Sequence, residues 1–206
     1  MIGNRRAAAR AAVLAALLSA AALVLDPWIW QHVRYDRVYE TDWGRLLRVF
    51  GSLVLWVPLA AAVLLERRSR DRAGAGTTWL LFWGPVVSGG MAELLKMLFR
   101  RERPGLHDGA VVFRAFSDRP FNTSALGMPS SHAMVAFAGA AILARLFPRT
   151  APVAYGLAAG CALTRLLARA HFGSDVVVGA LAGWAVGALL WKRFGAPRAP
   201  NPLEAR

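Results

Sequence analysis

The chain has 206 residues, of which 56% are hydrophobic and 18% charged, and its formal net charge at pH 7 is +13. Such an excess of basic residues is typical of nucleic-acid-binding proteins, but those proteins carry their charge on polar surfaces, and a mean hydropathy of +0.40 does not fit one. The hydrophobic content excludes a disordered chain, and a single cysteine excludes an intrachain disulfide framework. An integral membrane protein fits both the hydrophobicity and the charge.

Six apolar segments are candidates for membrane helices, because a helix needs about 20 mostly apolar residues to cross the hydrocarbon core. In chain order they cover about 8–29, 49–65, 77–98, 132–147, 152–170 and 175–191. We therefore predict an all-α fold, a polytopic helical membrane protein with six transmembrane helices in one domain over residues 1–206. The first two spans, at about 8–65, precede a helical core at about 77–192, which carries the motifs described below.

The first apolar segment has two interpretations. Three arginines followed by an apolar stretch could form a signal peptide. The segment continues into Asp26 without a clean small-residue cleavage site, and Trp28 and Trp30 resemble aromatic anchors at a membrane interface. We expect an uncleaved span.

The links between the apolar segments differ in charge, which predicts their orientation. One side holds 13 of the 25 basic residues and three of the 12 acidic ones, a net charge of +10, against +3 on the other side. Its basic residues are Arg5, Arg6, Arg10, Arg67, Arg68, Arg70, Arg72, Arg145, Arg149, Lys192, Arg193, Arg198 and Arg206. By the positive-inside rule this side, with both termini, is cytoplasmic. The arginine- and alanine-rich composition favours a bacterial inner membrane, with the other side facing the periplasm.

The later spans contain residues with structural interpretations. Pro58 in the second is tolerable in a bundle, since neighbouring helices can satisfy the freed carbonyl. Gly179, Gly183 and Gly187 recur every four residues in the sixth and provide a smooth face for close helix packing. Cys161 in the fifth is expected to be an inert packing residue.

Ionisable residues gather within or beside the outward ends of the last spans. They are Glu93, Lys96, Arg165, Arg169 and Asp175. A charge near hydrocarbon is unfavourable and indicates a functional site, although a long side chain near a helix end can also extend to water. Five such groups at one membrane face favour a site.

Three stretches of the outward side have the chemistry of a phosphate site. Lys96, Arg103 and Arg165 suit phosphoryl oxygens, because each arginine can bind two oxygens at once. Ser130 and the backbone N–H groups that open the fourth span would form an anion cradle at a helix N-terminus.

Two histidines complete this chemistry. His132 and His171 supply what phosphoryl transfer needs, a nucleophile and a proton donor for the leaving group. Asp175 follows His171 by four residues, one helical turn, and can fix the tautomer that leaves the other ring nitrogen free to attack phosphorus.

The three stretches resemble the signature of the type 2 phosphatidic acid phosphatase superfamily, K-x6-R-P, P-S-G-H and S-R-x5-H-x3-D. The match extends from Lys96 to Asp175 and keeps the spacing within each part. Ser131 stands where the family usually has Gly, and Thr164 where it usually has Ser. Serine still offers its N–H to a phosphate, and Thr164 keeps the hydroxyl.

The resemblance implies a metal-independent phosphatase without a cofactor. His171 would attack phosphorus and become transiently phosphorylated, Asp175 would orient it, and His132 would protonate the departing oxygen and then activate water. The residues implied to bind the phosphate and stabilise its transition state are Lys96, Arg103, Ser130, Ser131 and Arg165. Soluble acid phosphatases and vanadium haloperoxidases share this site, but six spans argue against both.

The predicted substrate is a membrane lipid phosphate at head-group depth, and nucleic acid is not expected as a partner. In a bacterium the resemblance implies undecaprenyl diphosphate or another polyprenyl diphosphate, phosphatidylglycerol phosphate, phosphatidic acid or a lipid A phosphate. An anion transporter, or an inactive scaffold of the same fold, is the alternative. Charges at one face favour surface chemistry over a transport path, and all the expected catalytic groups are present.

Other polar residues near these motifs have simpler interpretations. His32 and His107 are expected to be ordinary loop residues, and Glu93 to form a local ion pair with Lys96 three residues later. Arg100 and Arg101 either widen the anionic site toward a second phosphate or contact lipid head groups.

Overall fold

The computed structural model describes residues 2–70 and 77–195, and every regular element in these ranges is helical, which confirms the all-α prediction. The α-helices are α1 (Ile2–His32), α2 (Asp42–Val49), α3 (Leu53–Arg70), α5 (Leu80–Phe99), α6 (Ser131–Leu146), α7 (Ala151–Leu167) and α8 (Gly173–Leu190). The shorter elements are the 3-10 turns η1 (Val38–Glu40), η2 (Pro104–Leu106) and η3 (Pro148–Thr150), and a π-helical turn η4 (Trp191–Gly195).

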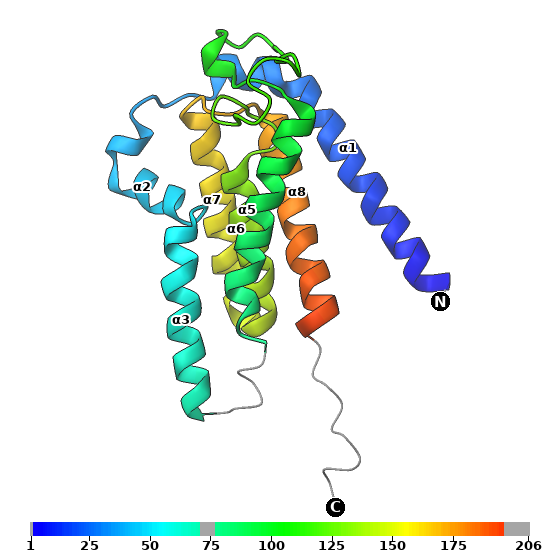
Figure 1. Cartoon of the computed structure of the whole chain (residues 1–206), viewed down its shortest axis with the longest axis vertical. Helices are drawn as coiled ribbons and strands as arrows, with labels where there is room; N and C mark the ends of the chain where they lie inside the picture. The colour runs from blue at the N-terminus through cyan, green and yellow to red at the C-terminus, as the bar shows by residue number, and fades with distance from the viewer. Residues whose placement is uncertain (1, 71–76, 196–206) are drawn as a thin grey trace, which may run out of the picture.

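Helix α6 lies at the centre of the bundle and packs against α5, α7 and α8 (Figure 1). Helix α1 contacts α8 but diverges from the bundle toward its own N-terminal end (Figure 1). The long link over 100–130 and the short turn between α7 and α8 lie at the same end of the bundle (Figure 1). The three signature stretches are therefore brought to one end of the molecule.

Two helical segments of the described chain, Ala9–His32 and Gly173–Gly195, are long and apolar enough to cross a membrane. Helices α2 and α3 would make a third span if the pair, bent by 66°, counts as one. Helix α6 is a shorter apolar helix. Each predicted span contains a helix at its place, but six transmembrane helices remain a prediction.

The helix of the second predicted span, α3, begins at Leu53 and not at residue 49, because the chain bends at residues 50–52 between α2 and α3. Gly51 lies in this bend, so close to α6 that a Cβ on it would be 2.7 Å from the carbonyl oxygen of His132. A side chain there would collide with the backbone of α6. The bend thus brings the end of α2 beside the N-terminus of α6.

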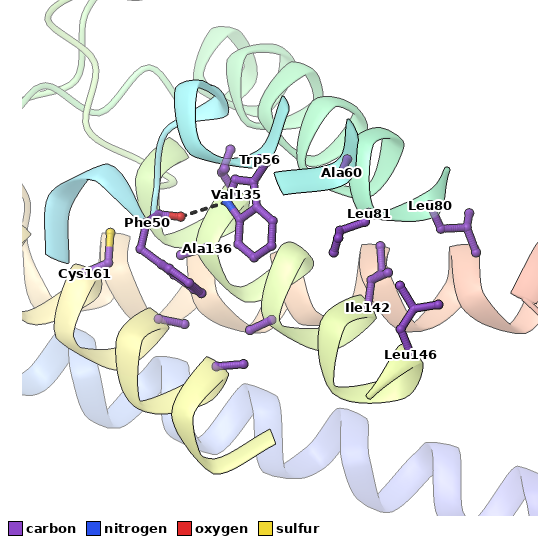
Figure 2. Close-up of a cluster of buried hydrophobic side chains, with 13 residues drawn as sticks. Phe50, Trp56, Ala60, Leu80, Leu81, Val135, Ala136, Ile142, Leu146 and Cys161 are labelled. Atoms are coloured by element: carbon purple, nitrogen blue, oxygen red, sulfur yellow. Dashed lines mark hydrogen bonds between the residues drawn. The ribbon is translucent and has the colours of Figure 1, made fainter. Parts of the chain in front are cut away.

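A cluster of buried side chains joins α3, α5, α6 and α7 (Figure 2). Trp56 is fully buried within it, and its indole N–H donates to the carbonyl of Phe50 over 2.9 Å (Figure 2). Cys161 lies in the same cluster, fully buried, as expected of a packing residue. This core fixes the bend between α2 and α3 against α6.

The glycines of α8 allow its backbone to contact α6 directly. A Cβ on Gly183 would lie 2.2 Å from the carbonyl oxygen of Met134, and one on Gly179 would lie 2.8 Å from that of Ser130. The same approach lets the backbone N–H of Ser130 donate to the carbonyl of Asp175 over 3.0 Å. The packing predicted for this glycine stripe therefore links the second and third signature stretches.

The orientation derived from charge remains a prediction. Arg72, Arg198 and Arg206, which contribute to that charge count, lie outside the described residues. The division into two N-terminal spans and a core, and the uncleaved first span, also remain predictions.

Candidate active site

The nucleophile predicted from the sequence, His171, is buried in the turn between α7 and α8, where 4% of its surface is exposed. Its Nδ1 lies 3.6 Å from Oδ2 of Asp175, too long for a hydrogen bond, and no other protein group in the described part of the chain bonds that nitrogen. Asp175 is fully buried, and its Oδ2 accepts the backbone N–H of Phe172 over 3.0 Å. The structure thus places the aspartate beside the histidine without closing the predicted bond.

The surroundings of His171 favour its neutral form. Burial lowers the pKa of His171 well below its ordinary value of 6.5, and the positive charges of Arg165, Arg103 and Lys96 lower it further. A neutral imidazole has the lone pair that a nucleophile needs. The same three cations that suit a phosphate therefore favour the neutral form of His171, which the predicted role as nucleophile requires.

The direction of this pKa shift of His171 can be measured. On acidification His171 should stay neutral past pH 6.5 and gain its proton only at lower pH. In a variant with His32, His107 and His132 changed to Gln, His171 is the only histidine left of four. NMR of that 15N-histidine-labelled protein in micelles should give a midpoint below 6.5, whereas a midpoint at or above 6.5 would contradict the described surroundings.

The three predicted cations surround this histidine with buried donors. Lys96 and Arg165 are each 5% exposed, and Arg103 is half-buried. The Nε atoms of Arg103 and Arg165 and the hydroxyl of Ser130 are buried without a hydrogen-bond partner among the described residues. Buried donors require acceptors, and the oxygens of a phosphoryl group would supply them.

Ser130 and Ser131 open helix α6. Ser130 is its N-cap and fully buried, with no capping bond from its side chain. The N–H groups of the first helical turn, which begins at Ser131, have no acceptor within the helix and lie where the anion cradle is predicted. The hydroxyl of Ser131 instead donates to Oε1 of Glu93 over 2.7 Å. This residue therefore offers its N–H to a phosphate while its side chain is held by α5.

Glu93 forms the predicted ion pair, with 2.8 Å between its Oε1 and Nζ of Lys96. Its other oxygen accepts the hydroxyl of Thr123 over 2.6 Å. Glu93 thus connects a cation of α5, the first residue of α6 and the long link, beyond the local pair that the sequence predicts.

His132 lies half-buried in the first turn of α6, within electrostatic range of His171, Arg165 and Lys96. This places both histidines at one site.

Two further residues of the predicted motifs and charge cluster bond elsewhere. Thr164 donates its hydroxyl to the carbonyl of Cys161 over 2.7 Å, so its side chain forms a hydrogen bond within its own helix, α7. Arg169, which also belongs to the charge cluster, has its guanidinium 4.4 Å from the ring centre of Trp30 on α1.

Two residues near the site, Tyr39 and Arg48, were not predicted from the sequence. Tyr39 accepts a hydrogen bond from Nη1 of Arg165 over 2.7 Å and donates to the carbonyl of Thr164 over 3.1 Å. Arg48 lies 4.7 Å above the Tyr39 ring, and its charge acts on Arg103 and Arg165. Neither belongs to a motif, and both are more than 100 residues from Arg165 in the chain.

Arg100 and Arg101 are each buried, with 2% of their surface exposed, and both guanidinium groups bind protein groups, so the structure favours neither of the two interpretations. Arg100 has a left-handed backbone, with φ of 54°, and ends α5. Its guanidinium donates to the backbone carbonyls of Arg114, Ala115, Asp118 and Pro120. It shapes the long link, while Arg101 binds carboxylates.

His107 lies in the long link, as expected, and has a partner there that the sequence did not predict. Its Nε2 is hydrogen-bonded to the carboxylate of Glu102, whose other oxygen accepts from Nε of Arg114 over 2.7 Å. These two bonds hold the pKa of Glu102 below its ordinary value. His32 is exposed, and its Nδ1 lies 2.9 Å from the carbonyl of Trp28.

Within residues 2–70 and 77–195, no group of three or more His, Cys, Asp or Glu side chains could hold a metal ion. The chemistry of the site described above is that of arginine, lysine, histidine and backbone N–H groups. Such groups can bind an oxyanion by charge and hydrogen bonding.

Comparison with known proteins identifies relatives of the chain. A family model described as the PAP2 superfamily matches residues 76–198. A lipid A 1-phosphatase of Rhizobium etli is 34% identical over 157 residues, which are 68% of this chain and 66% of that protein. A decaprenylphosphoryl-5-phosphoribose phosphatase of Mycobacterium tuberculosis is 36% identical over 163 residues, 78% of this chain and 84% of that protein.

The chain therefore spans just under two thirds of the Rhizobium relative and most of the mycobacterial one. A second decaprenylphosphoryl-5-phosphoribose phosphatase, from Mycolicibacterium smegmatis, is 34% identical over 138 residues, which are 66% of this chain and 69% of that protein. No solved structure matches the chain. The names of these relatives share the enzyme class, phosphatase, that the signature predicts.

Proposed function

Because the chain belongs to the PAP2 superfamily, we propose that it hydrolyses a phosphate group of a membrane lipid through a phospho-histidine intermediate, without a metal. The observation that carries this proposal is the buried His171, whose Nδ1 lies 3.6 Å from Oδ2 of Asp175, in a site with three cations. The relatives, which are lipid phosphatases by name, support the phosphatase class.

In the first step the lone pair of His171 Nε2 attacks phosphorus, and the bond between phosphorus and the lipid oxygen breaks. Protonated His132 gives its proton to that oxygen, so the lipid leaves as an alcohol. The imidazole of His171 becomes positively charged, and the nearby Asp175 carboxylate stabilises that charge. Lys96, Arg103 and Arg165 stabilise the charge on the phosphoryl oxygens, which is usually the largest contribution to such a reaction.

In the second step His132, now neutral, takes a proton from water. The resulting hydroxide oxygen attacks the phosphorus held on His171, and the phosphorus–nitrogen bond breaks. Inorganic phosphate leaves, His171 regains its lone pair and His132 is again protonated. The two histidines thus return to their starting states without any group beyond water.

For the substrate, the relatives' names describe phosphates carried on lipid A and on a decaprenyl-linked ribose. We favour a polyprenyl-linked phosphate or a lipid A phosphate over the glycerophospholipids, because these two classes occur in the names. The apolar helices α1 and α8 support a substrate within a bilayer. The site lies at the end of the bundle where α5 ends and α6 begins (Figure 1), and the charge count supports a periplasmic position for that end.

The test is release of inorganic phosphate by detergent-purified protein from a panel of lipids. It contains lipid A, a polyprenyl diphosphate, a polyprenyl-linked phosphosugar, phosphatidylglycerol phosphate and phosphatidic acid. We expect hydrolysis of at least one lipid, unchanged by a chelator, and inhibition by orthovanadate. A strict requirement for added Mg²⁺, or no release from any lipid, would contradict the proposal, and anion uptake by liposomes containing the protein would favour a transporter.

A further inference from the structure

A buried ionic network lies behind the pair of His171 and Asp175 and extends to the first helix. Asp26 of α1 is 3% exposed and Arg101 of the long link is 2% exposed. Nη2 of Arg101 lies 2.9 Å from Oδ2 of Asp26, and Nη1 lies 3.3 Å from Oδ1 of Asp175. One guanidinium therefore bridges a carboxylate of α1 and the carboxylate proposed to support the nucleophile.

Ser174 joins these charges to the start of α8. Its hydroxyl accepts from Nη1 of Arg101 over 2.6 Å and donates to Oδ2 of Asp26 over 2.6 Å. Its backbone N–H donates to Oδ1 of Asp26 over 2.9 Å. That N–H belongs to the first turn of α8 and has no acceptor within the helix, so a side chain of α1 caps the helix that carries Asp175.

Arg101 and Asp26 also contact the turn that contains His171. The guanidinium of Arg101 lies 3.9 Å from the ring centre of Phe172, the residue directly after His171. Gly173 lets α1 approach this turn, because a Cβ there would be 2.5 Å from Cδ1 of Ile29 and 3.2 Å from Oδ1 of Asp26. Arg101 thus contacts both the residue after the nucleophile and its aspartate partner.

The charges of this network suit the proposed reaction. Asp26, Arg101 and Asp175 together carry a net charge of −1, which balances the positive charge that His171 gains when it attacks phosphorus. A cation beside a buried carboxylate favours its ionised form, and Arg101 is that cation for Asp175. A buried arginine in turn requires a further carboxylate, and Asp26 supplies it.

We propose that Asp26 and Arg101 are positioning residues, through which the first helix orients the His171–Asp175 pair. Arg101 holds Asp175 in place and ionised, and Asp26 holds both Arg101 and the first turn of α8. This inference rests on the proposed function. It makes α1 a part of the active site as well as a candidate membrane anchor.

The test begins with Arg101→Gln and Asp26→Asn. We expect kcat to fall about 10- to 100-fold in each, as when groups that orient a functional histidine are removed, with KM changed less because the phosphate-binding cations remain. The acidic limb of the pH–rate profile should move to higher pH in Arg101→Gln, because Asp175 loses its cation. In Asp26→Asn it should stay or move to lower pH, because a negative charge near Asp175 is removed.

Matched controls change exposed residues outside the network. Arg119→Gln alters an arginine of the same link whose side chain is 59% exposed, and Asp42→Asn alters a fully exposed carboxylate. Both should leave kcat and the pH profile unchanged. Arg101→Lys should recover part of the lost kcat, since it restores the charge without the forked geometry.

A single variant can fail to fold, because it leaves one charge buried without its partner. The double variant Asp26→Leu/Arg101→Met removes both charges and keeps the volume apolar, so its thermal midpoint in detergent should be close to that of the wild type. Its kcat should nevertheless fall as in Arg101→Gln. A stable double variant with wild-type kcat would overturn the proposal, since the pair would then be merely structural.

Orthovanadate binding, followed by tryptophan fluorescence, separates this inference from the proposed function. If the wild type binds vanadate but hydrolyses no lipid in the panel, the substrate proposal fails. The positioning role of Asp26 and Arg101 is then tested by the Kd for vanadate. That Kd should rise about 10-fold in Arg101→Gln and remain unchanged in Arg119→Gln. A Kd unchanged in Arg101→Gln, or a wild type that neither binds vanadate nor hydrolyses lipid, would overturn it.

Discussion

His171→Gln should lower kcat for lipid phosphate hydrolysis about 10⁴-fold or more, because the variant has no nitrogen lone pair with which to attack phosphorus. Glutamine keeps a polar side chain of similar reach, so the buried turn between α7 and α8 should still form. The measurement is phosphate release by purified protein in detergent. His32→Gln is the matched control, since that histidine is exposed and bonds only a carbonyl of its own helix.

His132→Gln extends this test by separating the two steps. A lipid alcohol is a poor leaving group without a proton donor, whereas the nitrophenolate of p-nitrophenyl phosphate leaves without one. His132→Gln should therefore react with the nitrophenyl ester and then stall, because nothing activates water to hydrolyse the phospho-histidine. Labelled phosphate should accumulate on the protein in an acid-labile form, and not in the His132→Gln/His171→Gln double variant. Full activity in His171→Gln would show that another group is the nucleophile.

Arg165→Gln should lower kcat/KM about 10²- to 10³-fold or more, since it removes a buried cation from the phosphoryl oxygens. Arg165 is 5% exposed and its Nε has no protein partner in the described part of the chain, which leaves that donor for substrate. Arg165→Lys should recover only part of the activity, because an ammonium cannot bind two oxygens in a fixed plane. Arg45→Gln, which alters an exposed surface pair, is the control.

Tyr39→Phe gives the same prediction a finer test. It keeps the ring above which Arg48 lies and removes only the hydroxyl that holds Nη1 of Arg165. We expect kcat/KM to fall about 10-fold, as for loss of one hydrogen bond to a charged group. Wild-type kinetics in Arg165→Gln would contradict the assigned role of Arg165, and wild-type kinetics in Tyr39→Phe would show that Arg165 needs no such support.

The sequence predicts the helices of this protein and most of its candidate site, because both are local patterns. Each apolar segment produces a helix, although that of the second begins only after the bend where Gly51 meets α6. The signature residues lie in three short stretches whose spacing is set by the chemistry of binding a phosphate. Their nearness to one another follows once the spans are antiparallel neighbours.

The partners of the charged residues could not be predicted in this way. Arg100 and Arg101 are adjacent and chemically identical, yet one binds four backbone carbonyls and the other bridges two carboxylates. The sequence shows how costly a charge is in an apolar setting, but the group that compensates it can lie anywhere along the chain.

By itself the sequence determined the all-helical fold, the family and the residues that carry the proposed chemistry, since periodicity, hydropathy and motif spacing are properties of neighbouring residues. The tertiary structure was needed to show that Asp26 and Tyr39, which precede every signature residue, meet the site: Asp26 is linked to Asp175 through Arg101, and Tyr39 binds Arg165. Those contacts join residues 74 to 126 positions apart. Such contacts form only where helix packing buries the charges together, and that packing depends on the whole chain.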